Sequence, residues 1–152
     1  MQGRIRSVGQ ALLAVLLVVA AAAGAQAQKV NSGRGGVAVK GFDVVAYVTT
    51  GRPTEGSEQF VHRIGATTYR FASAANRDAF AKEPERYLPQ FGGFCAYAVS
   101  RGYTADIDPQ AWRIVAGKLY LNYNRGAQAK WEQDVTGNIG KGAANWPALS
   151  RQ

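Results

Sequence analysis

Residues 59–82, QFVHRIGATTYRFASAANRDAFAK, contain the pattern that decides the fold. Residues 59–64 and 67–71 are rich in β-branched and aromatic side chains, and a short connection with a glycine separates them, which is typical of a β-hairpin. Ser73 stands at an N-cap position, and residues 74–82 form helices readily. The stretch therefore predicts a hairpin followed by a helix.

Alternation along the strands predicts which side chains face the core. Phe60, His62 and Ile64 share one side of the first strand, and we expect that side to point inward. Tyr69 and Phe71 share the corresponding side of the second strand.

The second half of the chain repeats this kind of pattern. Residues 111–115 and 118–123 predict a second hairpin, 128–134 a short helix, and 139–146 a further helical or irregular piece. The expected buried residues of this hairpin are Trp112, Ile114, Leu119 and Leu121. No internal repeat stands out, although two hairpins each followed by a helix give a loose symmetry. The predicted class is α+β, a small single domain with antiparallel β-hairpins and short helices.

The first 27 residues resemble an export signal. Arg4 and Arg6 give a positive start, residues 11–23 form an apolar run, and residues 25–27 (AQA) fit a cleavage site. The run is shorter than the roughly 20 residues of a membrane span, although a retained anchor is the alternative. We predict a signal peptide at 1–27, a flexible leader at 28–36 and a domain at 37–149. This predicts a periplasmic or secreted protein with no stable membrane span after cleavage.

The charge pattern argues against nucleic acid as a partner. The chain carries a formal net charge of +8, with 18 Lys and Arg against 10 Asp and Glu. These basic residues are scattered singly, without the run or stripe that tracks phosphates. A small ligand, a metal ion or an envelope protein is the expected partner.

One cysteine, Cys95, and one histidine, His62, limit the chemistry of the chain. A lone thiol cannot close an intramolecular disulfide, so an exported domain of this kind depends on its hydrophobic core. A structural zinc site within one chain needs four Cys or His ligands, which excludes that type of site here.

Residues 69–80 and 83–87 closely resemble the YHS domain family. Metal-binding members carry the pattern Tyr-x-Phe-Cys-Ser-x-x-Cys-x-x-x-Phe, followed by x-x-Pro-x-x-Tyr and preceded by Asp-Pro-Val-Cys. In this chain Ala46, Ala72 and Asn76 stand at the three cysteine positions. Alanine has no donor atom and a neutral amide binds soft metals poorly, so the family thiolate site cannot form there.

The resemblance extends along most of residues 37–149. Further matching segments look like a bacterial exported subgroup of YHS domain-containing proteins that lacks the metal-binding cysteines: 41–43, 89–98, 118–123 and 145–147. The resemblance implies a treble-clef-like core of hairpin and helix, with a C-terminal hairpin and helix as an extension.

Cys95 is the main candidate site residue, and two interpretations stay open. If a helix begins at Phe94 or Cys95, its backbone N–H groups would favour a reactive thiolate. The alternative is a small buried hydrophobe. His62 is either a partly buried structural residue or a ligand that approaches Cys95. We expect Asp43 to cap a helix and Tyr47 to pack on its face.

Aromatic residues of the second half could line a pocket or form its core, and we expect the core. The residues concerned are Tyr97, Tyr103, Trp112, Tyr120, Tyr123 and Trp131.

Together these features predict a binding module without catalysis in the cell envelope. We expect metal-ion or small-ligand binding at Cys95, with His62, Tyr47 and Tyr97 contributing, and copper or another transition metal as the cofactor. The alternative is a structural or protein-interaction module with a degenerate, metal-free site. A thiol-dependent enzyme that uses Cys95 and His62 is the third hypothesis, and it lacks a recognisable nucleophile motif.

Overall fold

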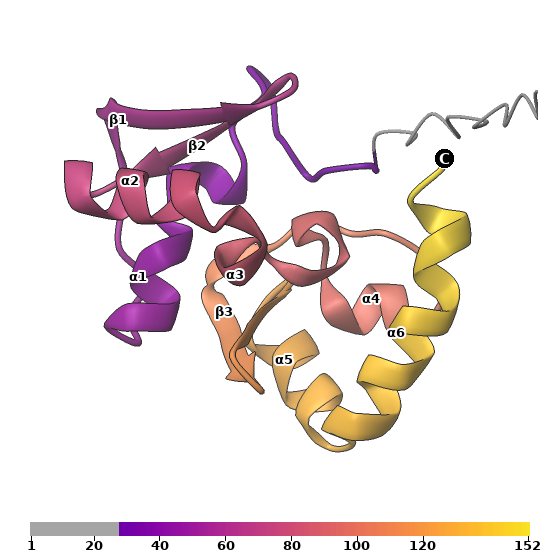
Figure 1. The fold of residues 1–152 in the computed structure, drawn as a ribbon. Helices are drawn as coiled ribbons and strands as arrows, with labels where there is room; N and C mark the ends of the chain where they lie inside the picture. The colour runs from indigo at the N-terminus through magenta and orange to yellow at the C-terminus, as the bar shows by residue number, and fades with distance from the viewer. Residues whose placement is uncertain (1–27) are drawn as a thin grey trace, which may run out of the picture.

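The computed structural model describes residues 28–152, so the predicted signal segment lies outside the described residues. The described chain folds into six α-helices and two antiparallel two-stranded sheets (Figure 1). This confirms the predicted α+β class. The treble-clef-like arrangement stays a prediction.

The first unit of the fold contains the hairpin and helix on which the sequence analysis began. The elements in order are η1 (Val39–Gly41), α1 (Val44–Thr49), β1 (Ser57–Ile64), β2 (Thr67–Phe71), α2 (Ala74–Lys82) and α3 (Pro84–Tyr87). The Ser73 side chain accepts a hydrogen bond from the backbone N–H of Asn76 and so caps α2. Both the hairpin and the helix at 74–82 are confirmed.

The second unit follows with the same kinds of element. These are η2 (Gln90–Gly93), α4 (Ala96–Ser100), β3 (Asp108–Val115), β4 (Lys118–Asn122), α5 (Arg125–Glu132) and the longest helix, α6 (Val135–Leu149). The second hairpin is confirmed. The helix predicted at 128–134 begins earlier, because Asn124 caps α5 by accepting from Ala127 N–H.

The two units correspond element by element, more closely than the loose symmetry of the sequence indicated. A short helix (α1 or α4), a hairpin and a capped helix (α2 or α5) follow in the same order. The first strand of each hairpin carries a register shift, one after Ser57 and the other after Asp108. The helix caps Ser73 and Asn124 match in the same way. The spacing between matching features is constant to within one residue.

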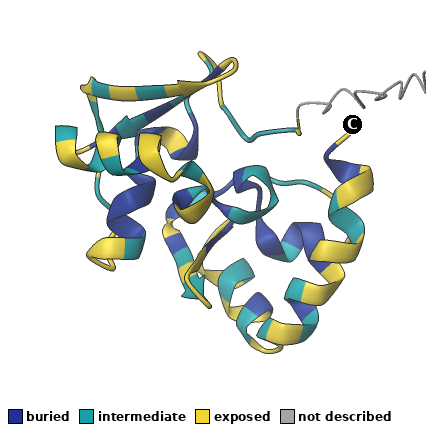
Figure 2. Cartoon of the chain, viewed as in Figure 1, coloured by how far each residue is buried: buried dark blue, intermediate teal, exposed yellow. Residues whose placement is uncertain are grey.

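One hydrophobic core joins the two units. The largest cluster of buried residues includes Val44, Phe71 and Phe80 from the first unit with Cys95 and Leu121 from the second. Figure 2 shows α1 and α4 largely buried, whereas α2, α5 and α6 have exposed outer faces. Helix α6 lies against α4 (Figure 1). Helices α1 and α4 therefore form the inside of the molecule.

The predicted inward faces are confirmed in part. Tyr69 and Phe71 are buried, but Ile64 is 41% exposed at the end of its strand, where the hairpin extends past the core. The prediction that Ile64 points inward is wrong for this reason. In the second hairpin Leu119 and Leu121 are buried, while Trp112 and Ile114 are partly buried against the core.

Residues 28–36 lie against the body of the protein instead of extending away from it as a leader. Lys29 N–H donates to Ser150 O at 3.0 Å, and Asn31 N–H donates to Gly92 O at 2.8 Å. Thr68 N–H donates to Gly36 O at 2.8 Å. These bonds show that the fold begins upstream of the predicted domain start at residue 37. The polar, glycine-rich composition of residues 28–36 gave no indication that the segment packs on the domain.

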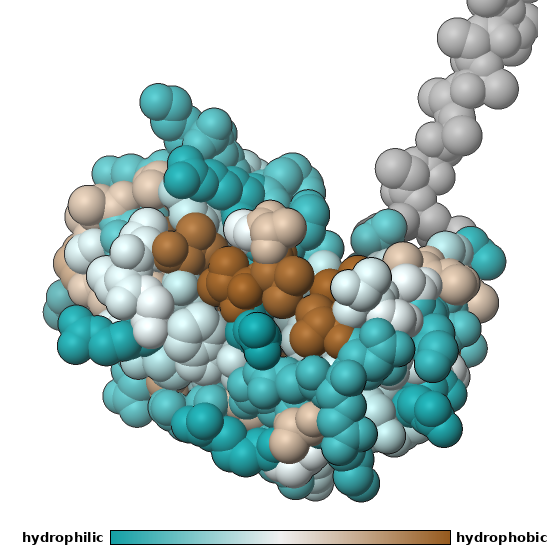
Figure 3. Space-filling view, turned by 90° about the horizontal axis from the view of Figure 1, so that it is seen from below, coloured by the Kyte–Doolittle hydropathy of each residue, from teal (hydrophilic) through white to brown (hydrophobic). Residues whose placement is uncertain are grey.

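The face that is seen from below in Figure 1 is largely hydrophilic at its edges (Figure 3). Figure 3 shows one apolar band across the middle of the face that is seen from below in Figure 1. None of the helices within residues 28–152 is both long and apolar enough to span a membrane.

Candidate functional site

The carboxylate of Asp43 organises the first unit. Asp43 is fully buried, and its Oδ1 accepts from the N–H groups of Val45 and Ala46 at the start of α1. Its Oδ2 accepts from Ala72 N–H and from Asn76 Nδ2, both at 2.8 Å. The expected role of Asp43 as a helix cap is confirmed, and its second oxygen also ties α1 to the segment between β2 and α2.

The three positions at which the sequence resemblance predicts metal-binding cysteines therefore meet at one place. Ala46, Ala72 and Asn76 come from separate elements, yet each donates a hydrogen bond to the Asp43 carboxylate. Two of the donors are backbone N–H groups and the third is a side-chain amide. Four N–H donors around one carboxylate satisfy a buried charge without a metal ion.

Cys95 has the same place in the second unit. It is the N-cap residue of α4, as Asp43 is of α1, and it is 2% exposed. Its Sγ accepts from Tyr123 N–H at 3.2 Å and donates to Asn122 Oδ1 at 3.6 Å. The Tyr123 contact corresponds to the bond between Asp43 and Ala72. The structure thus shows a buried and hydrogen-bonded thiol.

Asn122 supports the thiol from the end of β4. The Asn122 side chain is fully buried, and its Oδ1 also accepts from Tyr97 N–H at 3.1 Å. Its Nδ2 has no hydrogen-bond partner among residues 28–152. The bond from Tyr97 sets which end of the amide faces Cys95. Sequence reasoning missed Asn122, because a single asparagine at the end of a strand carries no signal of its own.

A pocket of about 470 Å³ opens beside Cys95. That volume is within the range of about 300–1,000 Å³ that is typical of small-molecule sites. Aromatic walls come from Tyr97, Tyr103 and Tyr123, and Lys130 is the one charged side chain among the lining residues. Ala98, Ala105, Asn124, Gly126 and Ala127 complete the lining.

The aromatic residues of the second half divide between this pocket and the core. Tyr103 is 54% exposed and Tyr123 is 56% exposed, so the expectation that both belong to the core is wrong. Trp131 and Tyr120 are buried, as expected, with their rings 5.2 Å apart. Strand alternation does not indicate the difference, because Tyr123 has the same parity as the buried Leu119 and Leu121 and is exposed only because β4 ends at Asn122.

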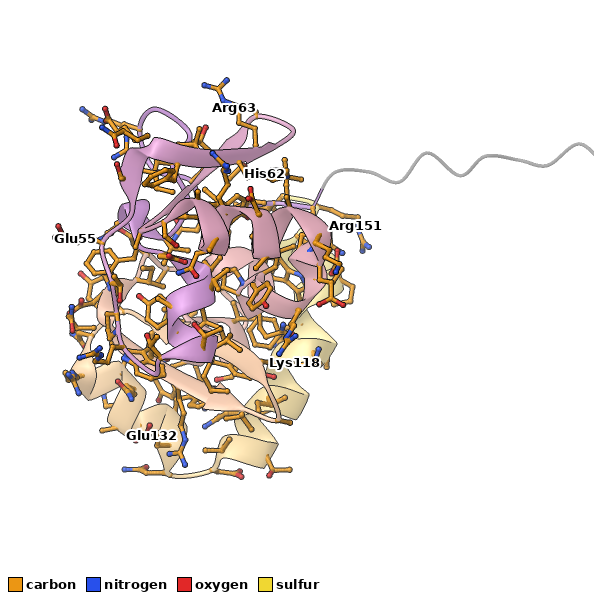
Figure 4. All side chains as sticks on the ribbon, turned by 60° about the vertical axis from the view of Figure 1, so that its left-hand side comes forward. Glu55, His62, Arg63, Lys118, Glu132 and Arg151 are labelled. Atoms are coloured by element: carbon orange, nitrogen blue, oxygen red, sulfur yellow. The ribbon has the colours of Figure 1, made fainter. Side chains whose placement is uncertain are left out.

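His62 and Tyr47 do not line the pocket beside Cys95. His62 lies on β1, where its ring packs edge-on against Phe80 at 5.6 Å between centroids. Figure 4 shows it on the hairpin above α2, far from Lys118 and Glu132, which belong to the second unit. The structure therefore brings Cys95 and Tyr97 together and leaves His62 apart from them.

Tyr47 has a structural position inside α1. Its hydroxyl donates to Pro109 O at 2.8 Å, and its ring meets Trp112 edge-on at 5.3 Å between centroids. Burial, with a smaller contribution from the negative charge of Asp108, raises the pKa of the Tyr47 phenol well above its usual value. The expected packed aromatic is confirmed.

The described residues offer no cluster suited to a metal ion. Within 28–152, no group of three or more His, Cys, Asp and Glu side chains is placed to hold one. The contacts of Cys95 are amide and N–H groups, which are poor partners for a soft metal.

A second and wider hollow lies on another side of the molecule. This groove of about 1,220 Å³ runs between the hairpin end at Ile64, the turn at Leu88 and the aromatic residues Phe91 and Trp146. Residues 28–30 and α6 form part of its walls.

Comparisons with protein-family models, curated proteins and solved structures found no match for this chain.

Proposed function

We propose that this protein is an exported, non-catalytic module that binds a small organic ligand as an accessory protein of the cell envelope. The pocket beside Cys95 is the observation that carries the proposal. It combines aromatic walls, a buried thiol and one lysine, and ligand sites commonly join apolar surface to a few polar groups in this way.

The proposal includes a YHS-type fold. What supports it is the meeting of Ala46, Ala72 and Asn76 around Asp43, since the family resemblance assigns the metal ligands to those three positions. Export is supported by the sequence of residues 1–27 alone.

Binding without catalysis is favoured over thiol chemistry. A Cys–His nucleophile needs the imidazole within about 3 Å of the sulfur. His62 instead packs on Phe80 in the first unit, while the sulfur is held by Asn122 and Tyr123.

An organic ligand is favoured over a metal ion for a similar reason. The residues around Cys95 offer aromatic faces and amide groups, whereas copper sites use several thiolate, thioether or imidazole ligands. A copper titration distinguishes the two. Stoichiometric copper binding that is lost in Cys95→Ser would contradict the organic-ligand proposal, and His62→Ala shows whether the histidine takes part.

The proposal is tested by titrating the ¹⁵N-labelled protein with benzoate, indole and benzamide. We expect at least one of these planar probes to shift the NMR amide signals of Tyr123, Asn124 and Ala127. Tyr103→Ala and Tyr123→Ala should weaken that binding, because each removes an exposed aromatic wall. Val61→Ala is the control, since Val61 is an exposed residue of the first unit. Absence of any shift, or shifts that both tyrosine variants retain unchanged, would refute the proposal.

The rival function is a structural or protein-interaction module. It is favoured by the apolar band in Figure 3, because contiguous exposed apolar surface often marks an interface. Light scattering over a range of protein concentrations tests self-association through such a surface. A stable dimer that masks the tyrosine pocket would favour this rival.

A further inference from the structure

The pocket beside Cys95 corresponds in position to a space in the first unit that the side chain of Asn76 fills. The caps Ser73 and Asn124 are matching residues, and the third residue after each is Asn76 or Ala127. Asn76 places its amide against Asp43, whereas Ala127 ends at its methyl group and lines the pocket. The pocket therefore opens where the second unit lacks the asparagine side chain.

The hydrogen bonds of the two caps differ by this one donor. Asp43 Oδ2 accepts from Ala72 N–H and from the Asn76 amide. Cys95 Sγ accepts from Tyr123 N–H, the counterpart of Ala72 N–H, and has no second N–H donor among residues 28–152. The donor that the second unit lacks is thus an amide N–H group.

We propose that the ligand of this pocket is a planar aromatic amide whose N–H group takes the place that Asn76 has in the first unit. The inference rests on the proposed function and names the chemistry of its ligand. The amide donates to Cys95 Sγ, and the ring lies among Tyr97, Tyr103 and Tyr123. Offset or edge contacts between aromatic rings favour such a ring beyond its apolar area.

The charge of the pocket limits the ligand further. Lys130 is the one charged residue of the lining, so a neutral or anionic molecule is favoured over a cation. Sulfur is a weak hydrogen-bond acceptor. The aromatic contacts therefore supply most of the affinity, and the amide supplies selectivity.

Two probes that differ in the N–H donor test the inference without any substitution. Benzamide carries the donor, and N,N-dimethylbenzamide keeps the ring and carbonyl but lacks it. The NMR amide signal of Tyr123 reports the binding of each probe. We expect benzamide to bind at least about fivefold more tightly than N,N-dimethylbenzamide, because the latter cannot form the one hydrogen bond to the sulfur. Cys95→Ser should keep this preference, because a hydroxyl also accepts, and Cys95→Ala should abolish it.

Two matched substitutions on α5 test the position of the amide. Ala127→Asn supplies the missing side chain, so benzamide binding should fall at least about tenfold. Ala129→Asn makes the same change at an exposed position of the same helix and should leave binding unchanged. The urea transition of each variant shows whether it folds.

The outcomes separate this inference from the proposed function. A benzamide preference that Ala127→Asn removes supports it. Equal binding of both probes, still dependent on Tyr103 and Tyr123, overturns the amide inference and leaves the binding function intact. Failure of both probes to bind also overturns the inference, while binding of indole or benzoate in the earlier titration decides the function separately.

Discussion

Asp43 and Cys95 are the N-cap residues of corresponding helices, and each accepts a hydrogen bond from the backbone N–H that follows the second strand of its hairpin. The first unit uses a carboxylate with four N–H donors, and the second uses a thiol with one N–H donor and a bond to Asn122. One geometry thus produces a filled polar centre in one unit and an open pocket in the other.

Removal of the Asp43 carboxylate should destabilise the protein strongly. Asp43→Ala leaves the N–H groups of Val45, Ala46 and Ala72 and the amide of Asn76 without their acceptor. We expect a loss of at least about 3 kcal/mol in the free energy of unfolding, because buried unsatisfied donors are costly. Urea denaturation measures it.

A surface aspartate provides the control for this experiment. Asp78 is exposed on α2, and its ion pair with Arg77 lies in solvent. Asp78→Ala should change the free energy of unfolding by less than about 0.5 kcal/mol. Similar losses for both variants would mean that Asp43 does not hold the first unit together.

The thiol of Cys95 should contribute to stability as a hydrogen-bonding group. Cys95→Ala leaves a small cavity and removes the sulfur that accepts from Tyr123 N–H. We therefore expect a loss of about 2 kcal/mol in the free energy of unfolding. Cys95→Ser should lose less, because its hydroxyl can accept from Tyr123 and donate to Asn122. Thermal unfolding at neutral pH compares the two. A serine variant less stable than the alanine variant would argue that packing alone matters at this position.

Two glycines of α6 test how that helix is docked. A β-carbon at Gly142 would meet Cζ of Phe91 at 2.6 Å, whereas a β-carbon at Gly140 would meet nothing within 4 Å. Gly142→Ala should therefore cost about 1–3 kcal/mol through overpacking. Gly140→Ala should stabilise the protein by up to about 1 kcal/mol, since alanine favours helix. If urea denaturation finds both variants stabilised, α6 does not rest on Phe91.

Local patterns predicted the elements well because their signals are short-range. The alternation at Tyr69 and Phe71 and the cap at Ser73 each depend on neighbours within a few residues, and all three were confirmed. Ile64 was placed wrongly, because alternation cannot say where a strand runs beyond the core.

The candidate site was harder to predict, because it depends on contacts between distant segments. Composition indicates Cys95 as a candidate, but its partners Asn122 and Tyr123 lie 27 and 28 residues further along the chain. His62 is a candidate because it is the one histidine of the sequence, but rarity carries no spatial information. The sequence does carry one signal that the two units correspond: Gly41-Phe42-Asp43 and Gly93-Phe94-Cys95 differ only at the cap.

Alkaline pH should unfold the protein by ionising buried tyrosines. Burial raises the pKa of Tyr69 to about 12, against an ordinary value near 10 in the unfolded chain. The folded state thus holds this proton more tightly, so its contribution to stability is complete below about pH 10 and is lost as the pH rises through about 12. Tyr47 shifts in the same direction, by burial and then by Asp108. We expect the free energy of unfolding, measured with urea, to fall steadily above about pH 10.

Substitution by phenylalanine separates the two tyrosines, because it removes the ionisable hydroxyl and keeps the ring. Tyr69→Phe should make the decline above about pH 10 shallower with little effect at neutral pH. Tyr47→Phe should do the same and also cost about 1 kcal/mol at neutral pH, since its hydroxyl donates to Pro109 O. An unchanged pH dependence in both variants would show that alkaline unfolding starts elsewhere. A neutral-pH loss confined to Tyr47→Phe would confirm that this hydroxyl ties α1 to β3.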